Sequence, residues 1–160
     1  MEKINIEIEV ENKGIIKAEL YPEIAPITVE NFVKLIGENF FDGLIFHRVI
    51  KGFMIQGGGL DVNGNQKHTS SIKGEFASNG VQNKLLHVRG VLSMARTMIP
   101  DSASSQFFIM HMDAPHLDGQ YAAFGQVTDG MDVVDAIADE RTDFSDRPLS
   151  DCIIKTIRLA

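Results

Sequence analysis

Tryptophan is absent from this chain of 160 residues, and cysteine occurs only once, at Cys152. A single cysteine excludes an internal disulfide framework and is typical of proteins in reducing compartments. No apolar run approaches the ~20 residues that a membrane-spanning helix needs. The opening residues, MEKINIEIEVEN, lack the basic and apolar segments of a secretory signal. We therefore expect a cytoplasmic protein that makes no contact with a membrane.

The chain also contains fewer basic than acidic residues. The 15 lysines and arginines are outnumbered by 22 aspartates and glutamates, which gives a formal net charge of −7 at pH 7. Nucleic-acid-binding domains are usually basic, so we expect no nucleic-acid partner. The 44% of hydrophobic residues and the dispersed charges are typical of a globular protein. The length suits one domain, residues 1–160.

The hydrophobic pattern predicts mostly strands. Residues 3–10 alternate apolar and polar side chains, which predicts a half-buried antiparallel strand, and residues 15–20 form its partner across a turn. Pro26 suits a first helical position, and the apolar stripe after it predicts a helix that ends near Gly37. Further predicted elements are strands at residues 40–56 (two strands), 72–76, 91–95, 106–111, 121–128 and 152–159, and a short helix after Gly130. Many short strands without a βαβ rhythm indicate a mainly antiparallel sheet, and pattern alone leaves barrel and sandwich open.

One stretch, residues 46–59 (FHRVIKGFMIQGGG), places a single arginine among apolar and aromatic residues. Arginine stays protonated and offers five N–H donors in a planar fork, so its burial is costly unless the donors are used. Arg48 is therefore either half of a structural ion pair or a group aimed at a ligand. Gln56, eight residues on, could orient its guanidinium.

This stretch resembles the signature of the cyclophilins, the peptidyl-prolyl cis-trans isomerases. Residues 90–96 (GVLSMAR) with 104–111 (SSQFFIMH), and residues 117–127 (LDGQYAAFGQV), resemble the next two core stretches of that family. The three blocks follow the order and the spacing of the family. The resemblance implies a closed eight-stranded antiparallel β-barrel capped by two α-helices.

The resemblance also implies an activity, which is rotation about Xaa–Pro bonds of proline-containing peptides and of unfolded or folding proteins, without cofactor or metal. It implies two catalytic residues, Arg48 as donor to the prolyl nitrogen and Gln56 as the group that holds Arg48. The implied substrate-binding residues are Phe53, Met54, Phe108 and Leu117 around the proline ring, Tyr121 as a wall of that pocket, Ala95, Arg96 and Gln106 along the backbone before the proline, and His116.

Several positions depart from the pattern of the family. His116 stands where many members have a tryptophan that contributes to cyclosporin binding, so we expect weak binding of that drug. Arg96 stands where many members have asparagine, and Tyr121 where some have histidine. Residues 65–71 lack the usual Gly-Thr-Gly-Gly pattern, which leaves preferences for residues flanking the proline open. We expect a monomer.

The hairpin around Lys51 and Gly52 presents a conflict. A strict two-residue turn would pair Arg48 with Ile55 and would place Gln56 on the opposite face of the sheet. The resemblance requires both side chains at one site, so we expect a wider turn or a bulge. Residues 57–80, rich in Gly, Asn, Ser and Lys, predict a long ordered loop, which in a compact domain usually serves function.

Other functions compete with the isomerase hypothesis. A non-catalytic proline-peptide binding module or chaperone would use the same groove with less need of Arg48, and a hollow barrel could bind a small apolar ligand inside. The apolar site residues could equally be plain core. Histidines 111 and 116 invite a metal or hydrolase interpretation, but the chain contains neither an HExxH nor a GxSxG motif.

Overall fold

A computed structural model describes the structure of residues 2–160. A single sheet contains eight strands in the order β3-β4-β6-β5-β7-β2-β1-β8, and every pairing is antiparallel. The strands are β1 (Ile4–Val10), β2 (Gly14–Leu20), β3 (Arg48–Ile50), β4 (Met54–Gly57), β5 (Val91–Met94), β6 (Phe107–Met110), β7 (Ala123–Asp129) and β8 (Ile154–Leu159). The helices are α1 (Pro26–Gly37), α2 (Met131–Ala138) and two 3₁₀ turns, η1 (Ala77–Asn79) and η2 (Pro115–Leu117).

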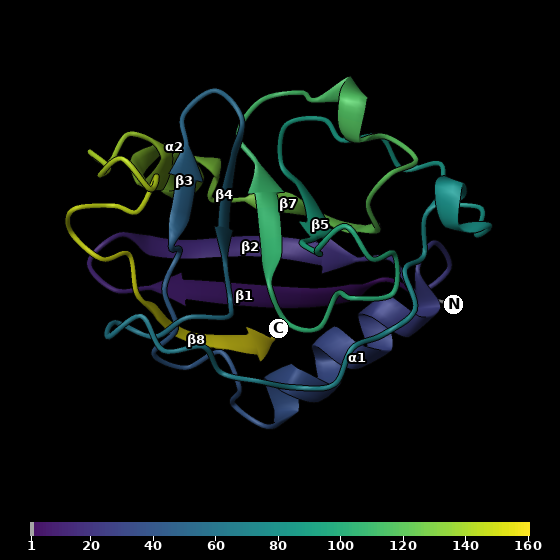
Figure 1. The fold of residues 1–160 in the computed structure, drawn as a ribbon. Coiled ribbons are helices and arrows are strands. Elements are labelled where there is room, and N and C mark those ends of the chain that lie inside the picture. The colour runs from purple at the N-terminus through teal and green to yellow at the C-terminus, as the bar shows by residue number, and fades with distance from the viewer. Residues whose placement is uncertain (1) are drawn as a thin grey trace.

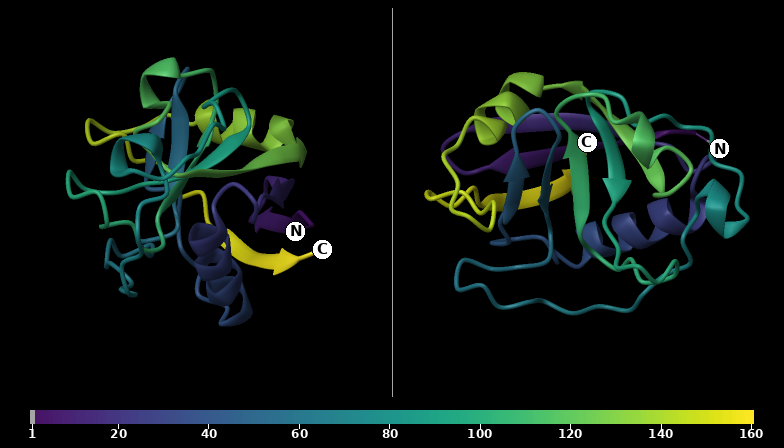
Figure 2. Two further views of the ribbon diagram at one scale, coloured as in Figure 1. Left: turned by 90° about the vertical axis from the view of Figure 1, so that its right-hand side faces the viewer. Right: turned by 45° about the horizontal axis from the view of Figure 1, so that its top comes forward.

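The sheet curls around a core, and α1 and α2 lie at its opposite ends (Figures 1 and 2). The segment that leads into the edge strand β3 lies beside the start of the other edge strand, β8. The Gly43 N–H donates to the Ile154 carbonyl at 2.8 Å, and the Phe46 N–H donates to the Cys152 carbonyl at 3.0 Å. Within the described residues, β3 and β8 themselves do not pair. The predicted mainly β architecture is thus confirmed as a curled eight-stranded antiparallel sheet with two α-helices.

Aromatic side chains fill the interior of the curled sheet. The ring of Phe32 on α1 lies 5.3 Å from that of Phe107 on β6 and 5.1 Å from that of Phe124 on β7. All three side chains are at most 1% exposed, and burial of each contributes about 1.5–3 kcal/mol. A curled sheet packed in this way leaves little room for the small internal ligand that was one of the competing hypotheses. No helix within residues 2–160 is both long and apolar enough to span a bilayer.

The first strands and α1 form where the pattern predicts them. Along β1, Ile6, Ile8 and Val10 are buried and alternate with more exposed residues, because successive side chains of a strand point to opposite faces. Pro26 opens α1, where its missing N–H costs nothing. The helix ends at Gly37, as predicted.

The predicted strand at residues 72–76 is wrong. The Ile72 N–H donates to the Ala103 carbonyl at 2.8 Å, and the Gly74 N–H donates to the Asp101 carboxylate at 3.0 Å. This backbone therefore bonds to a neighbouring loop rather than to a strand. Between β4 and β5 the only regular element is η1, so the predicted long ordered loop is confirmed. The first strand of the 40–56 hairpin is also shorter than predicted, since β3 begins at Arg48.

Candidate active site

The turn between β3 and β4 places two side chains of the site face to face. Arg48 pairs with Gln56, and Ile50 pairs with Met54, so residues 51–53 form a three-residue connection. Gly52 has a φ of +83°, a left-handed conformation that favours glycine. The wider turn that the sequence predicts is therefore confirmed. It puts Arg48 and Gln56 on the same face of the sheet, because directly paired residues share a face.

Three side chains from three neighbouring strands or their ends form a hydrogen-bonded chain. The Arg48 Nη1 donates to Gln56 Oε1 at 3.3 Å, and the Gln56 Nε2 donates to Gln106 Oε1 at 3.0 Å. Among residues 2–160, no carboxylate forms an ion pair with Arg48. The Arg48 side chain is exposed. Within the described residues Arg48 thus has no carboxylate partner, which argues against its interpretation as half of a structural ion pair. Most of the Arg48 donors remain open to a ligand.

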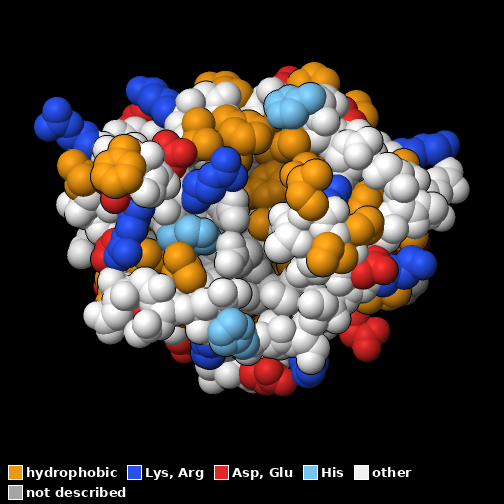
Figure 3. All heavy atoms as spheres, in the orientation of Figure 1, with side chains coloured by type: hydrophobic (Ala, Val, Ile, Leu, Met, Phe, Trp, Pro, Cys, Tyr) orange, Lys and Arg blue, Asp and Glu red, His pale blue; other side chains and the backbone are white. Residues whose placement is uncertain are grey.

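Beside this chain lies a hollow of about 130 Å³, and every residue that lines it is one of the predicted site residues. In the space-filling view a recess floored by hydrophobic side chains opens on this face, with a basic side chain at its rim (Figure 3). Drug-sized pockets measure about 300–1,000 Å³, so this hollow suits a single side chain. Its lining residues are Arg48, Phe53, Met54, Gln56, Ala95, Arg96, Phe108, Leu117 and Tyr121.

The apolar walls of the hollow are held by ring contacts. The Phe108 ring meets the Tyr121 ring edge-on, with centroids 5.8 Å apart. The Phe53 ring packs against the exposed His116 imidazole with centroids 5.7 Å apart, so the predicted site residue His116 supports Phe53 but does not itself line the hollow. Met54, Phe108 and Leu117 are 2–7% exposed. The wall residues are therefore part of a satellite core cluster as well as of the hollow.

A second hollow of about 170 Å³ adjoins the first and shares Gln56, Ala95 and Arg96 with it. The remaining predicted residue, Gln106, lines this second hollow. Together the two hollows form a groove. The lining of the groove carries two arginines and no carboxylate, although the chain as a whole has a formal net charge of −7. A neutral or acidic extended chain fits such a lining better than a cationic one.

Arg96 lines both hollows. Its guanidinium lies over the rings of Phe76 and Tyr121, at 4.6 and 4.7 Å from their centroids. It also donates to the carbonyl of Gln120 at 2.7 Å and to that of Thr97 at 2.9 Å. The longer side chain at this position is thus fixed by cation–π contacts and by carbonyl groups, which keeps it from closing the groove.

A buried network behind Phe108 escaped the sequence analysis. The His87 Nδ1 lies 3.1 Å from Asp118 Oδ1, and its Nε2 lies 2.8 Å from Ser93 Oγ. The His87 ring stacks on Phe108 with centroids 6.0 Å apart. Burial lowers the pKa of His87, and the Asp118 carboxylate opposes this shift only in part. No local pattern points to this network, because Asp118 lies 31 residues from His87 along the chain.

The described residues offer neither a cluster of metal ligands nor a reactive thiol. Within residues 2–160, no three or more His, Cys, Asp or Glu side chains lie close enough to hold a metal ion. Cys152 is 1% exposed, and its burial raises the pKa of the thiol to about 11. The thiol is therefore protonated and unreactive at neutral pH, as expected of a small buried strand residue.

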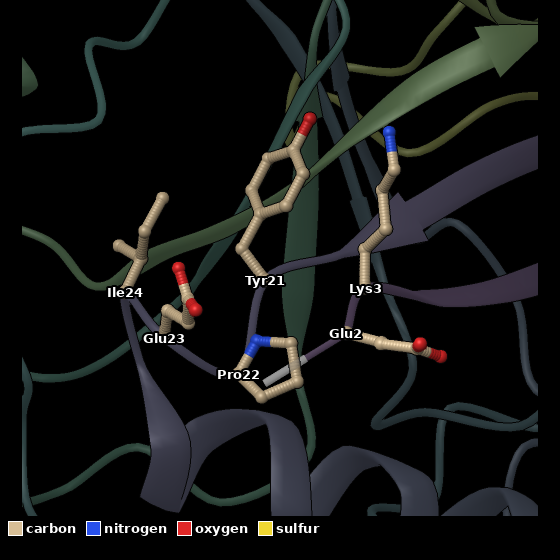
Figure 4. Close-up of a pocket in the computed structure, with 6 residues that line it drawn as sticks. All are labelled: Glu2, Lys3, Tyr21, Pro22, Glu23 and Ile24. Carbon is tan, nitrogen blue, oxygen red and sulfur yellow. The ribbon is translucent and has the colours of Figure 1, made fainter.

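A larger hollow of about 530 Å³ lies between the start of β1 and the start of α1. Figure 4 shows the Tyr21 hydroxyl and the Lys3 amine pointing the same way. Both groups bind Glu19, at 2.8 and 3.1 Å. Burial and Glu19 raise the pKa of Tyr21 to about 12. Since these polar tips are already engaged, and no predicted site residue lies here, the groove remains the candidate active site.

Comparisons with known proteins point to one family. The model of the cyclophilin-type peptidyl-prolyl cis-trans isomerases matches residues 5–159. A peptidyl-prolyl cis-trans isomerase of Acinetobacter baylyi is 52% identical over 137 residues, which cover 82% of this chain and 70% of the relative. Peptidyl-prolyl cis-trans isomerase B of Escherichia coli is 43% identical over 162 residues, 93% and 96% of the two chains.

Solved structures agree with these relatives. A cyclophilin-type isomerase of Cryptosporidium parvum superimposes with a TM-score of 0.85 at 30% identity, over 99% of this chain and 98% of its own. The same protein in the presence of the dipeptide Ala-Pro gives a TM-score of 0.83 at 31% identity, over 98% of both chains.

Proposed function

Because this chain belongs to the cyclophilin-type peptidyl-prolyl cis-trans isomerases, we propose that it rotates Xaa–Pro bonds in its groove with Arg48 as the catalytic donor. One observation carries the assignment of Arg48. Its guanidinium is held by Gln56 at 3.3 Å on the rim of an apolar hollow, without a carboxylate partner among residues 2–160. A cation placed in this way has donors to spare for a substrate.

The reaction needs no nucleophile. Rotation about a peptide bond has a barrier of ~18–20 kcal/mol, which arises because the nitrogen lone pair is delocalised into the carbonyl. In the twisted state the prolyl nitrogen becomes pyramidal and accepts a hydrogen bond, which neither planar form does. A fixed N–H donor from Arg48 would therefore bind the transition state more tightly than either ground state, which is the condition for catalysis.

The remaining predicted residues divide between the two halves of the groove. We assign the proline ring to the hollow formed by Phe53, Met54, Phe108 and Leu117, with Tyr121 as a wall and His116 packed against Phe53. Burial of the ring there would contribute on the order of 2 kcal/mol. We assign the backbone before the proline to Ala95, Arg96 and Gln106.

The substrates of this proposal are proline-containing segments of peptides and of unfolded or folding proteins. The Ala-Pro dipeptide present with the Cryptosporidium parvum relative supports this class. We further propose that residues 1–160 act as one isomerase domain, and that the curled sheet closes into a barrel. The hydrogen bond of Gly43 to Ile154, the first residue of β8, and that of Phe46 to Cys152, just before β8, support closure.

The test is exchange NMR on a short Xaa–Pro peptide, without protease, for the wild type and for Arg48→Ala. We expect the wild type to accelerate cis–trans exchange, and Arg48→Ala to lower kcat by about 10²–10³-fold, the usual cost of one transition-state donor. Arg141→Ala, at an exposed arginine after α2 that does not line the groove, is the matched control and should keep full activity.

The two outcomes separate an enzyme from a binding module. Lost turnover in a folded Arg48→Ala protein that still binds the peptide would support a donor role in the transition state. A wild type that shifts the peptide signals but leaves the exchange rate unchanged would overturn the catalytic proposal in favour of a proline-peptide binding module.

A further inference from the structure

The turn at residues 51–53 is an exposed support of the hollow to which we assign the proline ring. Lys51 and Gly52 are exposed, while Phe53 turns inward to line the hollow. Within the hairpin itself, the turn is closed by the bond from the Phe53 N–H to the Ile50 carbonyl at 2.9 Å. Loops of this kind are mobile unless other elements hold them. The position of the Phe53 ring therefore depends on contacts from outside the hairpin.

His111, directly after β6, supplies such contacts on both sides of the turn. The Gly52 N–H donates to His111 Nδ1 at 2.8 Å. The backbone N–H groups of His111 and Met112 both donate to the Phe53 carbonyl, at 2.9 and 3.3 Å. The His111 side chain is buried, with 5% of the residue exposed. One residue thus binds the turn through its ring and through its backbone.

The bond from Gly52 defines the state of the imidazole. Because Nδ1 accepts a hydrogen bond, the proton of the neutral ring lies on Nε2. Nε2 lies 3.2 Å from Asp135 Oδ1 on α2. Both ring nitrogens are therefore in use, which leaves none for a metal ion and none to activate a serine. The metal and hydrolase interpretations of His111 are thereby replaced by a structural one.

Asp135 is itself held firmly. Arg89 donates to both of its carboxylate oxygens, at 2.8 and 2.7 Å, and Arg89 Nη1 also donates to the His111 carbonyl at 2.9 Å. The bond to Arg89 is the main reason why the pKa of Asp135 lies below its ordinary value. The carboxylate therefore remains an anionic acceptor for the His111 Nε2–H, and it orients the ring from the helix side.

We propose that His111, oriented by Asp135, is a positioning residue that holds the 51–53 turn and so fixes Phe53 as a wall of the proline pocket. The proposal rests on the proposed function, since it assumes that the pocket beside Phe53 receives the proline ring. His111 touches neither the substrate nor Arg48 in this scheme. It acts through the backbone of Gly52 and Phe53.

Two variants at position 111 separate the acceptor from the rest of the side chain. His111→Leu keeps the bulk but removes the partner of the Gly52 N–H. His111→Asn keeps an acceptor near the place of Nδ1, because its Oδ1 sits at a similar distance from the backbone. Asp139→Asn is the control, since it removes a different contact to the same turn, the exposed ion pair with Lys51 at 2.9 Å. Such exposed pairs contribute little.

We expect His111→Leu to raise KM and the peptide Kd about tenfold while kcat stays within about twofold, because a displaced pocket wall weakens ground and transition states alike. His111→Asn should recover most of the affinity, and Asp139→Asn should match the wild type. The Gly52 amide, followed by NMR, should exchange with solvent at least about tenfold faster in His111→Leu than in His111→Asn.

Some results would overturn the proposal. An unchanged Kd in His111→Leu, or an equal loss in His111→Leu and His111→Asn, would show that the Nδ1 acceptor does not position the pocket. If His111→Leu fails to fold, two other measurements test the proposal. One is the comparison of His111→Asn with the wild type. The other is the nitrogen NMR shifts of the wild-type imidazole, because a protonated Nδ1 contradicts the scheme. Absence of turnover in the wild type would count against the proposed function alone, because the peptide Kd still tests His111.

Discussion

Replacement of Gln56 by leucine tests whether the orientation of Arg48 matters separately from its charge. Gln56→Leu removes the acceptor for Arg48 Nη1 and the donor to Gln106 Oε1. The guanidinium itself remains, and so do the apolar walls of the hollow beside it. If Gln56 only positions the donor, the variant should lower kcat and leave KM near its original value.

The expected size of the effect follows from the geometry. A hydrogen bond to a charged group contributes about 1.5–3 kcal/mol when it is well formed. The distance of 3.3 Å from Arg48 Nη1 to Gln56 Oε1 exceeds the usual N–H···O range, and the Arg48 side chain is exposed to solvent. We therefore assign about 1 kcal/mol to the bond, which corresponds to about a fivefold loss in kcat. This loss is far smaller than that expected for Arg48→Ala.

The assay is again exchange NMR on an Xaa–Pro peptide, at several peptide concentrations so that kcat and KM separate. Gln66→Leu is the matched control, because Gln66 lines the second hollow but belongs to no part of the Arg48 chain of hydrogen bonds. Two results would refute the reasoning. A loss as large as that of Arg48→Ala would mean that Gln56 does more than orient the guanidinium, and wild-type kcat would mean that Arg48 needs no such support.

Two further predictions concern the stability of the fold. Glu75 is 2% exposed and accepts from the Thr28 N–H and from Thr28 Oγ, both at 2.7 Å, which caps α1 from a distant loop. Glu75→Leu leaves these groups without a partner, so we expect a loss of about 3 kcal/mol and a Tm lower by roughly 10 °C. The exposed Glu30→Leu on the same helix should change Tm little, and equal Tm values for both variants would contradict the capping role. The second prediction concerns pH: burial is the main cause that lowers the pKa values of His47 and His87 below the ordinary 6.5. Below pH ~6.5 the unfolded chain therefore binds protons that the folded chain does not. As the pH decreases from there, the free energy of unfolding should decrease until the lowered pKa values are reached. Urea titrations at about pH 7.5 and about pH 5.5 measure this difference, and equal midpoints would argue against buried neutral imidazoles.

The sequence by itself determined the local elements and the family. Alternation over residues 4–10 is enough to predict β1, because only one face of that strand is buried. The start of α1 at Pro26 and its end at Gly37 follow from the backbone chemistry of these two residues. The three sequence blocks identify the isomerase family. They also require the wider turn that brings Arg48 opposite Gln56.

Only the tertiary structure decided the contacts between distant segments. Residues 72–76 have a strand-like composition, yet their N–H groups bond to Ala103 and to Asp101 on a loop that local sequence does not place beside them. The supports of the groove are equally non-local, since His87 meets Asp118 across 31 residues and Gly52 meets His111 across 59. Such pairs carry no periodic signal, because they depend on how the sheet curls rather than on spacing along a helix or strand. Sequence patterns can therefore predict candidate residues for a substrate site. The groups that hold those residues in place are identified only from the folded structure.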